Sequence, residues 1–333
     1  MGWKDLFKSK PPDLKPDPRL RWFGKLPTYA DYYSSAADAD WVVEFNDWLL
    51  KGCELHFARQ PAARREMHLQ TVSGILRLPK SGMTVFASIQ DYGGDTRGRP
   101  FPIAFYVGIP TAAWPGPTGD RVLSGLRVLS ELLLMRDLVV RFVNAPARFE
   151  GVFGGRTIDL AGLTAEAGDA SWRTAAQATP MESWFAQAVP CLKDGDSASW
   201  CAAVANWGGS IAKLEGDDFG PTLRLPLVMS LAVELQVAGW LRWLARRINV
   251  EQRFLSLLVQ KDAVHGTGRL TIIARDLIPE DYLLFTPLAS TLNFVDDACA
   301  LGGSRDVNGR SADLPGPPAA AAPKTWAEFA ESA

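Results

Sequence analysis

The sequence predicts an α/β protein of the α+β type, with antiparallel-rich sheets flanked by helices in two domains. Short runs of β-branched and aromatic residues, separated by turns that contain Gly or Pro, indicate hairpins in both halves of the chain. Longer segments with apolar residues at helical spacing lie between those runs. The 333 residues are enough for two domains of ordinary size.

The composition is that of a globular protein with nearly balanced charge. Hydrophobic residues make up 47% of the chain, and the formal net charge is −2. No basic cluster of the density that nucleic acid requires is present, so a nucleic-acid partner is disfavoured. Four cysteines occur without a C-x-x-C pair, and only three histidines accompany them, so we expect no metal, no cofactor and reduced thiols.

The chain shows no segment that predicts membrane insertion. Its N-terminus carries charge but no apolar core of a signal peptide. The most apolar segment, Leu225 to Leu244, is interrupted by Glu234, Gln236 and Arg242, whereas a membrane span needs roughly 20 apolar residues. We therefore expect a cytoplasmic protein.

An aromatic stretch from Arg21 to Tyr33 is the most informative part of the sequence. Its first four residues predict a buried strand that ends at Gly24, where glycine permits a close backbone approach or a positive φ. Pro27 stops strand pairing, and the residues after it turn the chain. Asp31 is expected to accept a local backbone hydrogen bond. On spacing alone, this is a strand and a turn that lead to a helix.

The first half then predicts one helix, a hairpin, a third strand and a second helix. The helix over residues 36–57 has an aromatic face, with Ser34 or Ser35 as its cap and Asp38 in a variant capping box. The other elements are strands at Thr71 to Leu78, Met83 to Ile89 and Phe101 to Ile109, a turn at Lys80 to Gly82, and a helix over residues 121–137. We expect Trp41, Phe45 and Trp48 to pack on the sheet that contains Phe23 and Phe101.

The second half begins after a polar, poorly periodic connection over residues 144–180. Helices are expected at Ser183 to Cys191, Ser197 to Trp207 and Pro226 to Ile248, followed by strands at Phe254 to Gln260 and Arg269 to Arg275. Asp281 to Phe285 is either a short strand or a helical turn. The predicted domains are a first domain at 19–143 and a second at 181–301, joined by the connection at 144–180. A flexible arm is expected at 1–18 and a disordered tail at 302–333. Within the tail, Trp326 to Phe329 could form a short docking helix.

The loop from Ser88 to Ile103 has two possible chemistries. Residues Gly93 to Arg99 could bind an anion through backbone amides and two guanidinium groups, but a polar hairpin loop with Arg99 paired to an acid is favoured. Ser88, Asp91 and His68 could suggest nucleophilic catalysis, yet no Gly-x-Ser-x-Gly elbow is present and no base is placed beside the serine. We expect no catalytic residue.

Two stretches of the chain resemble the TagF (ImpM) family of proteins associated with the type VI secretion system. Trp22-Phe23-Gly24-Lys25-Leu26-Pro27-Thr28 resembles the family's opening, with Ala30 in place of a glycine. The second stretch matches at Ser88, Asp91, Gly98, Arg99, Phe101, Pro102 and Ile103, with Ala87 and Pro100 as departures and a longer gap from Asp91 to Gly98. The resemblance covers mainly residues 20–110.

The resemblance implies a cytoplasmic, post-translational regulator of type VI secretion that represses by stoichiometric protein binding. It also implies a partner from the same system, for which a forkhead-associated-domain scaffold protein is the candidate. The partner-binding candidates in the two stretches are Lys25, Asp31, Ser88, Asp91, Arg97 and Arg99. We expect at least one acid–base pair among the charged residues of this set. The alternatives are a structural or assembly component of the secretion apparatus, or a hydrolase that uses the loop at 88–99.

Overall fold

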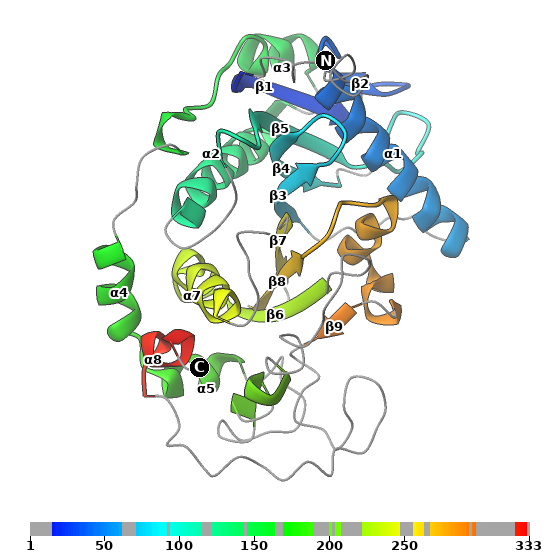
Figure 1. Cartoon of the computed structure of the whole chain (residues 1–333). Helices are drawn as coiled ribbons and strands as arrows, with labels where there is room; N and C mark the ends of the chain where they lie inside the picture. The colour runs from blue at the N-terminus through cyan, green and yellow to red at the C-terminus, as the bar shows by residue number, and fades with distance from the viewer. Residues whose placement is uncertain are drawn as a thin grey trace, which may run out of the picture.

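The computed structural model of the chain (Figure 1) describes residues 15–61, 71–91, 94–114, 121–142, 145–163, 169–188, 200–201, 204–207, 222–246, 256–262, 267–292, 295–297 and 324–331. Its centre is one nine-stranded sheet with the order β2-β1-β5-β4-β3-β7-β8-β6-β9. Neighbouring strands are antiparallel except β6 and β9. The strands are β1 (Asp17–Gly24), β2 (Tyr33–Ser34), β3 (Val72–Leu78), β4 (Met83–Gln90), β5 (Ile103–Pro110), β6 (Thr222–Val228), β7 (Ser256–Asp262), β8 (Thr267–Ile273) and β9 (Val295–Asp297).

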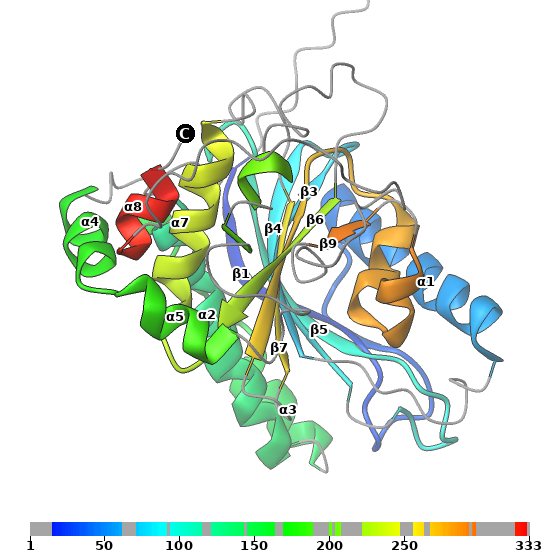
Figure 2. The same ribbon diagram turned by 90° about the horizontal axis from the view of Figure 1, so that it is seen from below.

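Helices cover both faces of the sheet, so the α+β prediction with an antiparallel-rich sheet is confirmed. Figure 2 shows α2, α5, α7 and α8 on one face, and α1 with the 3-10 segment η5 on the other. The helical elements are α1 (Asp40–Arg59), α2 (Arg121–Phe142), α3 (Pro146–Phe153), η3 (Ala161–Leu163), α4 (Asp169–Gln177), α5 (Met181–Ala188), α7 (Val233–Ala245), η5 (Pro279–Phe285), η6 (Pro287–Thr291) and α8 (Trp326–Glu331).

The strands of the two predicted domains belong to one sheet. β3 of the first half pairs with β7 of the second, from Val72 opposite Gln260 to Ile75 opposite Leu257. Gln260 also ties β7 to η5, because its buried side-chain amide donates to the Leu284 carbonyl at 2.8 Å. The division into two domains therefore does not divide the sheet.

Helix α1 carries the aromatic face that the sequence predicts, but its start is different. The residue before the helix is Ala39, which makes no side-chain cap, so the prediction of a cap at Ser34 or Ser35 is wrong. The Ser35 hydroxyl is used on β1 instead, where it accepts from Trp22 N at 3.1 Å. Ser35 therefore forms a hydrogen bond to the backbone of β1 and does not cap the helix.

The face of α1 packs on the sheet as expected. Trp41, Phe45 and Trp48 share one buried cluster with Phe23 and Phe101. Trp48 also donates its indole N–H to the Ile278 carbonyl at 2.9 Å, which ties α1 to the segment before η5. This η5 segment settles the alternatives at 281–285 in favour of a helical turn.

The predicted long helix from Pro226 to Ile248 is wrong in its first part. Thr222–Val228 is the strand β6, and the helix α7 begins only at Val233. All seven residues of β6 are buried, and its apolar end, Leu225 to Val228, gives no periodic signal that separates a strand from a helix. Pro226 fits the strand because β9 pairs only with Thr222 to Arg224 on that side.

Helices are present in the predicted connection and in the predicted tail. α3, η3 and α4 lie in the predicted connection at 144–180. In the predicted tail, α8 packs against α7, with Trp326 and Phe329 buried, so the docking helix is present and the tail is ordered at 324–331. In the predicted helix at 197–207, the described residues 200–201 and 204–207 are helical, whereas residues 1–14 of the arm lie outside the described part of the chain.

Candidate functional site

The two stretches that carry the family resemblance lie side by side because β1 pairs with β5. Phe23 is opposite Ala104, and Gly24 is opposite Ile103. Gly24 has a φ of +153°, and a Cβ built on it would lie 2.1 Å from the Pro102 carbonyl oxygen. Both properties expected of this glycine, a positive φ and a close backbone approach, are therefore present.

Asp95 is the centre of the contact between the two stretches. Its side chain is fully buried, and Oδ2 lies 3.2 Å from Lys25 Nζ and 2.7 Å from Arg99 Nη2. Oδ1 accepts from the backbone N–H groups of Arg97 and Arg99 at 2.9 and 3.0 Å. Burial alone would raise the pKa of Asp95, but these backbone and side-chain donors outweigh it and lower the pKa to about 2.

This arrangement decides between the two readings of the 93–99 loop. The backbone amides of Arg97 and Arg99, which could have bound an external anion, already donate to the carboxylate of Asp95, and Arg99 Nε donates to the same carboxylate. The polar hairpin loop with a paired Arg99 is therefore confirmed. Glycine at position 98, with a φ of +67°, allows the tight turn.

Backbone contacts hold the loop against the turn that follows β1. Thr96 N donates to the Tyr29 carbonyl at 2.9 Å, and Arg99 Nη2 donates to the Ala30 carbonyl. Lys25 and Arg99 thus pair with Asp95, an acid outside the predicted set, and a pair between two members of that set stays a prediction. A signal for Asp95 was available, because Asp side chains in Gly-containing loops commonly accept backbone N–H groups two to four residues on.

The remaining candidate residues differ in their access to solvent. Asp31 and Arg97 are exposed, and Asp31 Oδ1 accepts from Tyr32 N at 2.9 Å, as expected. Asp91 is half-buried at the end of β4. Ser88 is fully buried within β4, between β3 and β5, and does not reach the surface.

The described residues offer no arrangement for nucleophilic catalysis at Ser88. Its Oγ has no hydrogen-bond partner among them. His68 lies outside the described residues. Asp281 accepts from Ile278 N and pairs with Arg275 at 2.7 Å, so it has a structural role.

Aromatic side chains form one wall of a cavity next to Asp95. Tyr32 stacks on Phe23, with ring centroids 5.3 Å apart, and meets the edge of Phe101 at 4.9 Å. The cavity has a volume of about 270 Å³ and is lined by Lys25, Tyr32, Leu50, Cys53, Glu54, Phe57, Arg99, Pro100 and Phe101. Burial raises the pKa of the Cys53 thiol to about 12, so this cysteine lacks the thiolate character of a reactive nucleophile.

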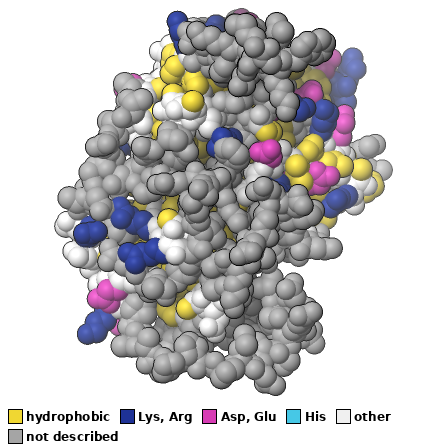
Figure 3. Space-filling model, in the orientation of Figure 1, with side chains coloured by type: hydrophobic (Ala, Val, Ile, Leu, Met, Phe, Trp, Pro, Cys, Tyr) yellow, Lys and Arg dark blue, Asp and Glu magenta, His cyan; other side chains and the backbone are white. Residues whose placement is uncertain are grey.

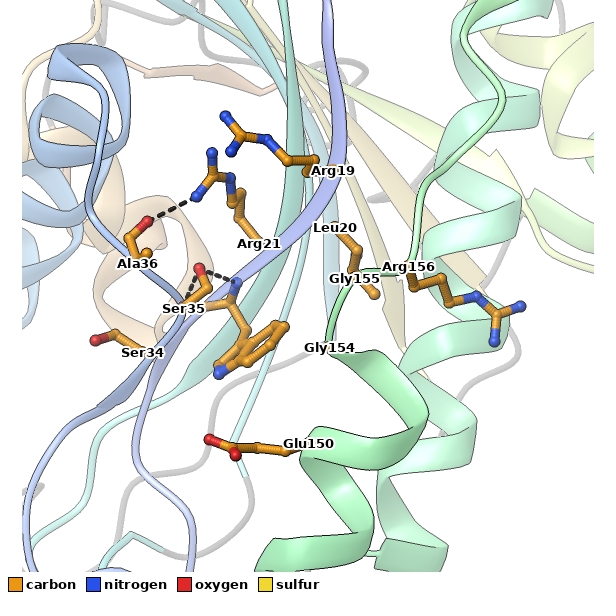
Figure 4. A pocket seen from close by; sticks show the side chains of 11 residues that line it. Arg19, Leu20, Arg21, Ser34, Ser35, Ala36, Glu150, Gly154, Gly155 and Arg156 are labelled. Atoms are coloured by element: carbon orange, nitrogen blue, oxygen red, sulfur yellow. Dashed lines mark hydrogen bonds between the residues drawn. The ribbon is translucent and has the colours of Figure 1, made fainter.

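A second cavity, of about 390 Å³, lies along β1 between the residues around Ser35 and the turn after α3 (Figure 4). Its arginines are engaged in structural contacts. Arg21 donates to the Ala36 carbonyl at 2.7 Å and pairs with Asp17 at 2.8 Å, and Arg19 bridges Asp17 and Asp38. This network fixes the entry to α1.

Metal and membrane sites are not found in the part of the chain that the structure describes. No group of three or more His, Cys, Asp or Glu side chains in it could hold a metal ion. None of the described helices combines the length and apolar character that crossing a membrane requires.

Similarity to known proteins is found at the level of solved structures. No protein-family model matches the chain, and no curated protein matches it. The crystal structure of PA0076 from Pseudomonas aeruginosa PAO1 is similar, with a TM-score of 0.31 and 18% identity over 41% of this chain and 61% of that one. The match thus spans less than two thirds of PA0076, and at this TM-score it carries no argument about function.

Proposed function

We propose that this chain is an accessory protein of a type VI secretion system and represses the system post-translationally by stoichiometric protein binding. The observation that carries the proposal is the pair of stretches that resemble the TagF family, at 22–28 and 88–103. Their contact through Lys25, Asp95 and Arg99 supports the proposal, because it gives both stretches one structural purpose.

The surface next to this contact suits binding better than turnover. The buried Asp95 holds the loop in place, while the side chains of Arg97, Arg99 and Tyr32 are exposed to solvent. Tyrosine and arginine on a rigid support are enriched at the centres of protein interfaces. The resemblance makes a forkhead-associated-domain scaffold protein the first partner to test.

The test is graded production of the protein in a bacterium with an active type VI system, with secretion of the system's tube protein as the measurement. A stoichiometric repressor should reduce secretion in proportion to its amount. Asp31→Lys with Arg97→Glu should weaken repression, because both side chains are exposed beside the Asp95 contact. Arg99 is left unchanged because it pairs with buried Asp95.

A matched control lies on the opposite face of the sheet. Arg127→Glu on α2 makes the same charge change as Arg97→Glu, at an exposed position, and should leave repression intact. Undiminished secretion at high excess of the folded protein would contradict the proposal. Full suppression far below the amount of every partner would favour catalysis, and stable co-purification with sheath or baseplate proteins would favour the structural alternative.

A further inference from the structure

The cavity beside Asp95 has two apolar walls from different parts of the chain. Helix α1 supplies Leu50 and Phe57, the turn after β1 supplies Tyr32, and the loop before β5 supplies Pro100 and Phe101. Figure 3 shows hydrophobic side chains at the surface around α1, next to acidic and basic ones. The cavity volume of about 270 Å³ exceeds the ~150 Å³ that accommodates a benzene molecule in an engineered core cavity, so one large side chain fits.

Tyr32 is held in place although 42% of it is exposed. Its ring stacks on Phe23 with an interplanar angle of 9° and meets Phe101 at 89°. Lys25 Nζ lies 4.9 Å from the centroid of the same ring. A ring fixed by these neighbours loses little conformational freedom on binding, which is the property of an interface anchor.

The two sides of the cavity carry charges of opposite sign. Lys25 and Arg99 line one side and share a single buried carboxylate, Asp95, which lies behind them. These three charges sum to one positive charge. Glu54 on α1 is the acid that lines the cavity, and Asp31 lies in the turn beyond Tyr32. An incoming carboxylate is therefore favoured on the Lys25 and Arg99 side and disfavoured next to Glu54.

We propose that this cavity receives one large apolar side chain with an adjacent carboxylate, both from a segment of a partner protein. The apolar group would fill the space between Phe57 and Tyr32, and the carboxylate would face Arg99. The choice of a protein segment as the occupant rests on the proposed function. The chemistry of the occupant rests only on the geometry and charges of the cavity.

The test uses the full-length protein and the short blocked peptide acetyl-Gly-Ser-Phe-Glu-Gly-Ser-amide. Binding is followed by methyl NMR at Leu50, with Leu134 as the reference, since Leu134 is exposed on α2 on the other face of the sheet. We expect concentration-dependent shifts at Leu50 alone. Replacing the peptide's Phe by Ala should abolish them, and replacing its Glu by Lys should weaken them.

Variants of the protein distinguish binding in this cavity from non-specific binding of the peptide. Glu54→Lys should tighten binding of the Phe-Glu peptide by roughly two- to fivefold, the size of an exposed ion-pair effect, and should not tighten binding of the Phe-Lys peptide. Glu182→Lys on α5, an exposed position on the other face, should change neither. Tyr32→Ala should weaken binding of the Phe-Glu peptide.

Three outcomes would overturn the inference: no shift at Leu50 at millimolar peptide, equal binding of the Phe-Glu and Phe-Lys peptides, or equal binding of free phenylacetate. The last would assign the cavity to a small acid. None of these results depends on secretion, so a failure here leaves the repression experiment to judge the proposed function, and a failed repression experiment leaves the cavity chemistry standing.

Discussion

Lys25, just after β1, and Asp95, in the loop between β4 and β5, form an ion pair with 3.2 Å between Nζ and Oδ2, and both side chains are almost completely removed from solvent. The pair joins segments 70 residues apart in the chain. Because Arg99 and two backbone amides also bind Asp95, the carboxylate fixes the loop and the turn in one arrangement.

Replacing Asp95 by Asn should therefore destabilise the protein by about 3 kcal/mol, at the lower end of the range for breaking a buried ion pair, because Arg99 is partly exposed. Chemical denaturation measures the change. Asp31→Asn, at an exposed site in the adjacent turn, is the control and should stay within about 0.5 kcal/mol. Equal effects of the two substitutions would mean that the buried ion pair adds no more to the free energy of unfolding than the exposed Asp31 does.

The same carboxylate makes stability depend on pH in the acid range. The pKa of Asp95 falls from an ordinary value of 3.8 to about 2 in the folded protein. The folded state therefore binds this proton less readily than the unfolded state, so the contribution is present above pH 3.8 and is lost as the pH falls toward 2. The stability difference between wild type and Asp95→Asn should shrink over this interval, and a constant difference from pH 5 to pH 2 would contradict the assignment.

A third prediction concerns the aromatic face of α1. Trp48→Ala should cost about 3 to 5 kcal/mol, because it removes a buried ring and leaves the Ile278 carbonyl without its 2.9 Å donor. Val43→Ala, on the same helix but 50% exposed, should change the free energy of unfolding by less than about 0.5 kcal/mol. If denaturation shows the two variants to be alike, α1 does not pack as described.

Local patterns in the sequence account for the first half better than for the second. The turn residues predict the hairpin of β3 and β4, and the periodicity of α1 predicts its aromatic face of Trp41, Phe45 and Trp48. The β3–β7 pairing joins residues such as Val72 and Gln260 that no local pattern connects, so one sheet could not be predicted. In the candidate site, the partnership of the two stretches could be expected, but Asp95 as their common acid depends on a tertiary contact.

Helix α8 gives a further prediction, at the glycine against which its tryptophan packs. A Cβ on Gly239 of α7 would lie 2.2 Å from Trp326 Nε1, so Gly239→Ala should displace Trp326 and destabilise the protein by about 1 to 3 kcal/mol. Gly151→Ala in α3 meets no atom within 4 Å and should instead stabilise by up to about 1 kcal/mol through helix propensity. Trypsin cleavage after Lys324 should become faster only in the Gly239 variant; a stabilised Gly239→Ala protein would show that α8 does not occupy this position.

The last prediction separates two glycines of the candidate site by what surrounds them. Gly24 and Gly98 both have positive φ, so alanine at either position carries a backbone cost of about 1 to 2 kcal/mol. At Gly98 nothing lies within 4 Å of the added Cβ, and the cost should stop there. At Gly24 the Cβ would also meet the Pro102 carbonyl oxygen at 2.1 Å, which is main chain and cannot turn aside, so β1 and β5 must separate. Gly24→Ala should therefore lower the free energy of unfolding by clearly more than Gly98→Ala, and denaturation curves of equal midpoint for the two variants would show that β1 does not approach residues 102–103 this closely.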